Sequence, residues 1–390
     1  MFEREIERDT ALNFTKEAEF EKFTEELNAQ SAWFTGYKAG DLEVVPVKSG
    51  SAPLPKGEFA YSTAEVVNEM ADKGGLYLKI RGGIKIPINL STAPFTMDDR
   101  AGARCKLVSD LFNMQSYEKY AEILNEGFTT YGNMTVKMLM RGGRIHAIHT
   151  NKYVDLSQDE FRRIVHAYMN TNFPTSSFIY AGYTAERTHF DYAVCESRDK
   201  FFSAYAEAWI KAGLPEPMLK KSYPILSFST GDTGKQAICI TPKLRIGNGN
   251  FPLGSELSIK HASSAKEDVI VQKCTQAFSD MQEGLNTIED MLKIELVHPY
   301  AVFVRAAMET GIVGKAKAAI SAVLDNFKDF YIQGTDTVTA FNVYYEMCQI
   351  ENYGEFEQLS AATKLQVLEA LNRLIKLNWR KLDVSGREEF

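Results

Sequence analysis

The chain has 390 residues, of which 24% are charged and 45% are hydrophobic, and its formal net charge at pH 7 is −7. This length allows two or three domains whose cores need no disulfides. The five cysteines are scattered and never spaced as C-x-x-C, which argues against a disulfide framework and a zinc knuckle and favours the reducing cytoplasm. The start MFEREIERDTALNF has no apolar signal core, and no segment approaches the ~18 apolar residues of a membrane span, so we expect no membrane partner.

The charge is distributed unevenly along the chain. Residues 79–164 hold 13 basic and 9 acidic residues, and residues 200–279 hold 10 and 6, whereas residues 1–78 and 280–390 carry net charges of −7 and −6. A basic middle between acidic ends is compatible with a nucleic-acid partner, which an evenly acidic chain would repel. Ordinary scatter of surface charge gives the same pattern, so this alternative stays open.

In chain order, the sequence pattern predicts an α+β fold with three regions. Residues 1–90 form an acidic N-terminal region with helices and short strands, which includes a loop near residues 48–58 and a strand pair joined by a Gly-Gly turn. Residues 91–262 form a central α+β domain, which is rich in hairpins with intercalated helices. Residues 263–390 form a helical region, because apolar residues recur there at helical spacing without a strand pattern.

The segment TVKMLMRGGRIHAIHT, residues 135–150, predicts a β-hairpin that turns at its Gly-Gly pair. In a regular register Arg141 lies opposite Arg144 and Lys137 lies opposite Ile148, on a face that is cationic at its tip. The alternate residues form an apolar face. Two opposed arginines repel each other, so we expect a phosphate or a carboxylate, or else water and salt, to relieve them.

The segment after this hairpin predicts a helix. Ser157 stands three residues before Glu160, which is the spacing of a capping box. Apolar residues then recur at helical spacing as far as Tyr168, and Arg162 and Arg163 fall on the opposite face. We include these two arginines among the candidate phosphate contacts.

The segment FSTGDTGKQAICITPKLRIGNGN contains two glycine clusters that suggest a phosphate loop. A Walker-type loop fails here, because Ser229 stands where its first glycine is needed and Lys235 is followed by glutamine. The stretch KQAICI alternates as a strand, so no helix N-terminus follows to hold an anion. We interpret Gly231–Gly234 as the loop of a β-hairpin, and we expect Lys243 and Arg245 to share one face of its second strand.

The six histidines of the chain include one pair that suggests a metal site. His146 and His149 are three residues apart, and in a strand such residues face opposite sides and do not readily share an ion. His189, Asp191 and Cys195 are the other conceivable ligands. Because no G-x-S-x-G elbow and no catalytic cysteine context is present, we expect no cofactor, no metal and no catalytic residues from local motifs.

Four segments carry a resemblance to a known family: MLMRGGRIHAIHTNKYVDLSQDEF, PILSFSTGDTGKQAICITPKLRIGNGN, LSIKHASSAKEDVIVQKCTQAF and TDTVTAFNVYYEMCQIENYG. In this order they resemble the phage/plasmid-like proteins of the domain-of-unknown-function 932 family over roughly residues 97–353. The matching features are Lys152 with Tyr153, the Gly231–Gly234 turn, and Lys260 with His261, whereas the third strand ends differently. The resemblance implies a phage, prophage or plasmid origin, and proteins in that setting commonly handle DNA or meet host defence proteins.

We therefore expect a non-enzymatic mobile-element protein whose basic, β-rich centre binds nucleic acid, with single-stranded DNA preferred. The candidate contacts are one ring that can stack on a base and eight cations: Tyr153, and Lys137, Arg141, Arg144, Arg162, Arg163, Lys243, Arg245 and Lys260. This interpretation requires the cations to converge into one groove when the chain folds.

Two alternatives to nucleic-acid binding stay open. The first is a protein-interaction module, such as an inhibitor of a host defence factor or an oligomeric scaffold, whose partner is a host protein or further copies of this chain. Its helical C-terminal part and acidic ends would form the contact surface. The second alternative is an enzyme whose active site is assembled from residues far apart in the sequence.

Overall fold

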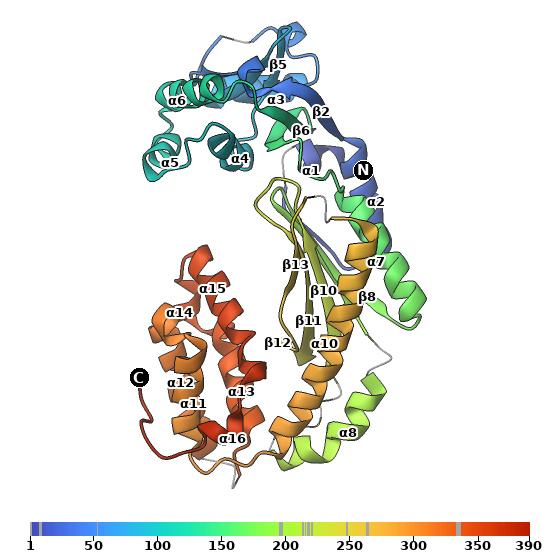
Figure 1. Ribbon diagram of the computed structural model, residues 1–390, viewed down its shortest axis with the longest axis vertical. Coiled ribbons are helices and arrows are strands. Elements are labelled where there is room, and N and C mark those ends of the chain that lie inside the picture. The colour runs from blue at the N-terminus through green and yellow to red at the C-terminus, as the bar shows by residue number, and fades with distance from the viewer. Residues whose placement is uncertain are drawn as a thin grey trace.

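The computed structural model shows a curved α+β molecule with an N-terminal lobe at one end, a large sheet in the middle and a helical bundle at the other end (Figure 1). The structure describes residues 2–7, 10–52, 54–194, 198–212, 214, 216, 219, 221–246, 249–262, 265–332 and 337–390. Within these residues, no helix combines the length and the apolar character that crossing a membrane requires.

The middle of the molecule is an antiparallel seven-stranded sheet, which we call sheet A. Its strands in spatial order are β1 (Leu12–Phe14), β8 (Ser177–Thr184), β9 (Arg187–Ala193), β10 (Tyr223–Thr230), β11 (Ile238–Ile246) and β12 (Gly249–Pro252), and β13 (Leu257–Ile259) also pairs with β11. The β10–β11 hairpin confirms the predicted strand pair around Gly231–Gly234.

Helices cover one face of sheet A and leave the other face turned toward the side on which the bundle lies (Figure 1). The covering helices are α2 (Glu17–Ala29), α7 (Gln158–Asn172) and α10 (Glu267–Lys293), with α1 (Glu3–Glu7) and α8 (Arg198–Lys211) at the periphery. The ring of Phe190 in β9 lies 5.7 Å from Phe161 of α7 and 5.4 Å from Phe20 of α2. Since alternate strand residues point to opposite sides, the neighbours of Phe190 in sequence lie on the open face.

The capping box that begins α7 is partly formed, because the Ser157 hydroxyl accepts the Glu160 backbone N–H.

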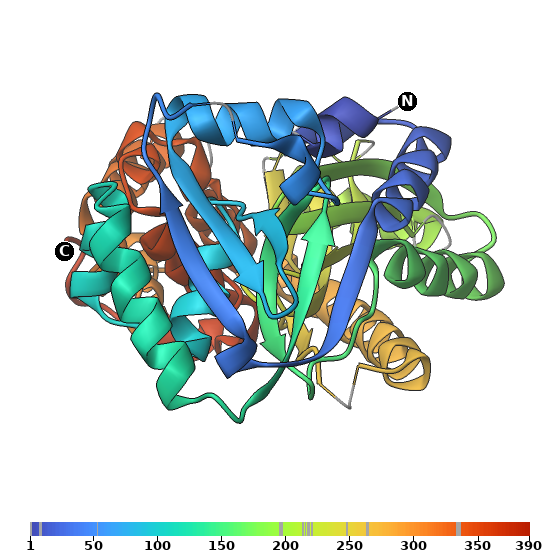
Figure 2. The same ribbon diagram turned by 90° about the horizontal axis from the view of Figure 1, so that it is seen from above.

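The N-terminal lobe is built on two three-stranded sheets that meet edge to edge. Their strands are β2 (Ser31–Lys38), β6 (Thr135–Arg141) and β7 (Arg144–Thr150) in sheet B, and β3 (Leu42–Val47), β4 (Gly75–Ile80) and β5 (Ile84–Pro87) in sheet C. A parallel bridge between Ile88 and Ile145 joins them, and Figure 2 shows their strands side by side. The helices of the lobe are α3 (Ala64–Lys73), α4 (Ala93–Arg100), α5 (Lys106–Asn113) and α6 (Tyr117–Thr130), and 3₁₀ turns cover Ala39–Asp41 and Lys56–Glu58.

The C-terminal helices form a bundle that shares its core with sheet A. They are α11 (Pro299–Thr310), α12 (Val313–Ile332), α13 (Ala340–Cys348), α14 (Gly354–Glu357), α15 (Ala361–Leu371) and α16 (Trp379–Leu382), with 3₁₀ turns at Gln349–Asn352 and Leu374–Lys376. The Phe251 ring of β12 stacks on Tyr345 of α13 at 5.1 Å, and the Tyr344 hydroxyl donates to the Pro252 carbonyl at 2.6 Å.

The predicted region boundaries near residues 90 and 262 do not coincide with breaks in this architecture. β1 pairs with β8 and β2 pairs with β6, so residues before 90 belong to the same sheets as residues after it. The core of the lobe likewise draws on both sides of residue 90, and α10 packs on sheet A rather than only on the bundle. Strand pairing between distant segments decides these boundaries, and composition alone does not reveal it.

The β6–β7 hairpin confirms its predicted tip and corrects its register. Arg141 lies opposite Arg144, as predicted, but Lys137 pairs with His149 rather than with Ile148. His146 has no partner on β6, which makes it the extra residue of a β-bulge. The bulge therefore moves His149 onto the same face as Lys137 and Arg141.

Candidate functional site

A buried ion pair joins the N-terminal lobe to sheet A. Arg141 of β6 pairs with Asp232 in the β10–β11 turn, and the two residues are 1% and 5% exposed. The Arg141 Nε also donates to the Ser31 hydroxyl at 3.0 Å, and Gln158 Nε2 donates to the Asp232 carboxylate at 3.3 Å. The glycine-rich turn thus anchors the lobe through a carboxylate instead of cradling a phosphate.

A column of rings lies beside this ion pair. Tyr153 stacks between His149 and His261, with ring centroids 3.8 Å and 5.1 Å away. Burial lowers the pKa of both histidines to about 4, so both rings are neutral near pH 7. His149 Nε2 lies 3.0 Å from the Asp232 carbonyl oxygen, and the Tyr153 hydroxyl donates to the Gly231 carbonyl at 3.4 Å. Tyr153 is therefore occupied on both ring faces and cannot stack on a base in this conformation.

The other cations of the hairpin and of α7 are also paired with carboxylates. Lys137, which is 7% exposed, pairs with Asp155, and Arg144 lies 2.5 Å from a Glu69 oxygen. The expectation that a carboxylate relieves the two opposed arginines is thus confirmed, with Asp232 serving Arg141 and Glu69 serving Arg144.

The two arginines of α7 bind carboxylates of their own helix and of α2. Arg162 is 3% exposed and lies 3.1 Å from Asp159 and 3.2 Å from Glu21. Arg163 is exposed and pairs with Asp159 at 2.9 Å and with Glu25 at 3.4 Å. Because Arg162 is buried between these helices, it does not lie on a solvent-exposed face as the helical pattern predicted.

The groove of converging cations that the sequence interpretation required is therefore not formed by the predicted residues. Lys137, Arg141 and Arg162 are buried in ion pairs, so we remove them from the candidate site. Arg144 and Arg163 keep partial exposure, but each already has a carboxylate partner. The carboxylates come from α2, α3, α7, the loop after β7 and the β10–β11 turn, and most of them lie far from their cations in the sequence, where a local pattern cannot reveal them.

The open face of sheet A carries a row of polar side chains in register. Tyr180 of β8 lies opposite Asp191 of β9, Asp191 lies opposite Ser227 of β10, and Ser227 lies opposite Thr241 of β11. In the next row the His189 ring lies on Gly182, where a Cβ atom would come within 2.3 Å of the ring. The Tyr180 and His189 rings are half-exposed, with centroids 5.3 Å apart.

Cations lie on either side of this polar row along the strands, toward the β10–β11 turn and toward the opposite edge of the sheet. Arg187 at the start of β9 and Lys260 just after β13 are exposed, and neither forms an ion pair within the part of the chain that the structure describes. Lys243 and Arg245 alternate with Leu244 in β11, which places both on the open face as predicted. Lys243 Nζ donates to the Ser227 hydroxyl at 3.2 Å, and Arg245 Nη1 donates to Asn250 at 3.4 Å.

No family model, curated protein or solved structure matches this chain. The resemblance to the phage/plasmid-like family of unknown function thus stays a prediction. The geometry of the candidate site is therefore the basis on which we infer its function.

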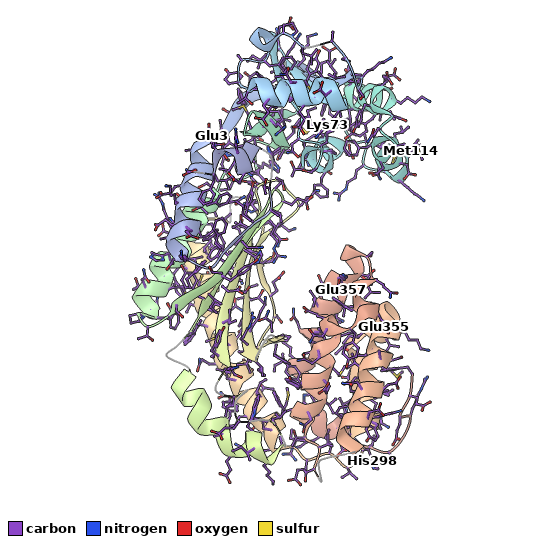
Figure 3. All side chains as sticks on the ribbon, turned by 180° about the vertical axis from the view of Figure 1, so that it is seen from behind. Glu3, Lys73, Met114, His298, Glu355 and Glu357 are labelled. Atoms are coloured by element: carbon purple, nitrogen blue, oxygen red, sulfur yellow. The ribbon has the colours of Figure 1, made fainter. Side chains whose placement is uncertain are left out.

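A cavity of about 1030 Å³ lies elsewhere, in the lobe between α3 and the strands β4 and β5, where Figure 3 labels Lys73. Its wall includes the α3 carboxylates Glu65, Glu69 and Asp72, and the cations Lys73 and Arg144. Glu69 forms ion pairs with both of these cations.

His146 and His149 contact different parts of the molecule. His146 Nδ1 lies 3.3 Å from the Thr92 hydroxyl, whereas His149 contacts the β10–β11 turn. In the parts of the chain that the structure describes, no three His, Cys, Asp or Glu side chains are grouped as metal ligands, and Cys195 lies outside those parts.

The sequence interpretation named three of the cations on the open face, Lys243, Arg245 and Lys260, and missed the polar row between them. The shared strand face of Lys243 and Arg245 could be predicted from strand alternation. Tyr180, Asp191 and Ser227 lie on three different strands, and only the pairing of those strands brings them together. The alternation of His189 and Asp191 with buried aromatic residues in β9 is the one local signal that could have indicated the open face.

Proposed function

We propose that the protein binds single-stranded nucleic acid on the open face of sheet A. The observation that supports this proposal is the combination of half-exposed rings, Tyr180 and His189, with cations on the same face. Arg187 and Lys260 are exposed near the β10–β11 turn, and Arg245 is half-exposed at the opposite end. Bases stack on such rings without sequence preference, and cations at either end can contact the backbone. The mobile-element origin that the family resemblance implies is part of the same proposal.

The length of the face suits a short stretch of single strand. Cys239 and Arg245 are six residues apart in β11, which corresponds to about 20 Å of strand. Lys260 lies near the Cys239 end, because Ser258 pairs with Cys239. Arg245 and Lys260 therefore keep their predicted role as backbone contacts, and Arg187 is assigned as a third contact in place of the buried cations.

Binding to a labelled oligothymidine, measured by fluorescence anisotropy across a salt series, tests this proposal. With three phosphate contacts, the plot of log affinity against log salt should have a slope of about −2. The double charge reversal Arg187→Glu/Arg245→Glu should weaken binding and reduce the slope to about −0.7. Tyr180→Leu should cost about 1–3 kcal/mol of binding free energy through lost stacking.

The matched control is Arg380→Glu/Lys381→Glu, which makes the same change in net charge on exposed residues of the bundle. We expect this control to bind like the unaltered protein. Equal weakening by both double variants would show a general charge effect and would contradict the assigned face. Absence of binding at low salt would remove the proposal and favour the protein-interaction alternative.

A further inference from the structure

The centre of the open face holds a serine, a lysine and an aspartate in hydrogen-bond contact. Ser227 Oγ donates to Asp191 Oδ1 at 2.6 Å and accepts from Lys243 Nζ at 3.2 Å. The three side chains come from the neighbouring strands β9, β10 and β11, and all three are half-buried. Because strand pairing fixes their backbones, the contact between hydroxyl and amine is held in place.

We propose that Ser227 is a nucleophile for acyl transfer, with Lys243 as its general base and Asp191 as a positioning residue. A serine hydroxyl within hydrogen-bond reach of a base is the arrangement from which covalent catalysis starts, and here Asp191 positions the hydroxyl rather than the base. Serine and lysine form this pair in some hydrolases. The inference does not rest on nucleic-acid binding, and Lys243 is not among the three cations assigned to that function.

The environment of Lys243 favours the neutral amine that a general base needs. Burial lowers the pKa of Lys243, and the nearby guanidinium of Arg187 lowers it further. The carboxylates of Asp191, Glu351 and Glu256 act in the opposite direction, and burial is the largest of these effects. Lys243 also acts on His189, whose pKa is lowered mainly by burial.

The proposed substrates are a small carboxylic ester and water. The Ser227 hydroxyl first turns its proton from Asp191 to the neutral Lys243 amine, and Ser227 Oγ then attacks the carbonyl carbon as this proton passes to Lys243. The bond from the carbonyl carbon to the alcohol oxygen then breaks, and the Lys243 ammonium returns the proton to the leaving alkoxide. Water attacks the acyl-Ser227 ester with Lys243 again as base, which releases the carboxylic acid and restores Ser227.

Acetylation by p-nitrophenyl acetate tests the proposal, with release of p-nitrophenolate followed over time and the acetylated residue located by peptide mass mapping. We expect an acetyl group on Ser227, formed faster as pH rises and Lys243 loses its proton. Ser227→Ala should abolish this adduct. Lys243→Met should slow its formation about 10²–10⁴-fold, the usual contribution of a general base.

Lys243→Arg separates catalysis from a structural role. Arginine keeps the charge and can donate to Ser227, but it does not accept a proton. We expect Lys243→Arg to be as slow as Lys243→Met while the unfolding midpoint stays close to that of the unaltered protein. Asp191→Asn should slow the reaction less than either. Absence of a Ser227 adduct in the unaltered protein, or an adduct formed equally fast in Lys243→Arg, would overturn the assignment.

Discussion

Asp232→Ala is expected to lower the free energy of unfolding by about 3–5 kcal/mol, because it leaves a buried guanidinium without its carboxylate. Arg141 is 1% exposed, and Asp232 is the carboxylate with which it pairs. The substitution also removes the acceptor for Gln158 Nε2. Urea unfolding of the variant and of the unaltered protein measures the difference.

A double-mutant cycle separates the ion pair from other effects of removing Asp232. Asp232→Ala should cost much less in the Arg141→Met background, where no buried charge is left unpaired. The matched control is Arg163→Ala, which breaks ion pairs of an exposed arginine and should cost less than about 1 kcal/mol. A loss below about 1 kcal/mol for Asp232→Ala, or equal losses in both backgrounds, would contradict the role assigned to this pair.

This ion pair and those of Lys137, Arg144 and Arg162 explain why the cations of the hairpin and of α7 are not free to contact phosphates as predicted. The hairpin of residues 135–150 was predicted at its tip, because a Gly-Gly turn and alternating residues are local signals. The partners of its cations were not predictable, since Asp232 stands 91 residues from Arg141 and Glu69 stands 75 residues from Arg144. A basic strand face read from sequence therefore does not distinguish a phosphate site from a buried salt bridge.

The fold class was predicted correctly. Features set by neighbouring residues were predicted as well, whereas features set by contacts between distant segments were not. Local patterns predicted the long helix that the structure places at Glu267–Lys293 and the start of α7 at Ser157. The bulge at His146 was not predicted. A bulge adds one residue to a strand, and the alternation of residue types in the sequence does not mark where this residue is inserted. The contact between Ser227 and Lys243 was missed for a related reason, since it depends on the register of β10 against β11.

Glu346→Gln is expected to stabilise the protein above neutral pH by up to about 3 kcal/mol. Glu346 lies in α13 and is 8% exposed, and its carboxyl makes no hydrogen bond or ion pair with any residue that the structure describes. Burial raises the pKa of Glu346 to about 7 from the ordinary value of 4.5. The folded protein therefore holds this proton at a pH where the unfolded chain has released it, and the stability is lost as pH rises from about 4.5 through about 7.

Glutamine has the shape of the protonated acid and cannot ionise, so the variant should lose this pH dependence. Urea unfolding at about pH 5 and about pH 8 should show similar stability for the two proteins at the lower pH and a more stable variant at the higher pH. Glu355→Gln, an exposed carboxylate of α14, is the matched control and should change stability by less than about 0.5 kcal/mol at either pH. A Glu346→Gln variant that follows the unaltered protein at both pH values would show that Glu346 is ionised at no cost, which requires water or a cation to reach it inside the bundle.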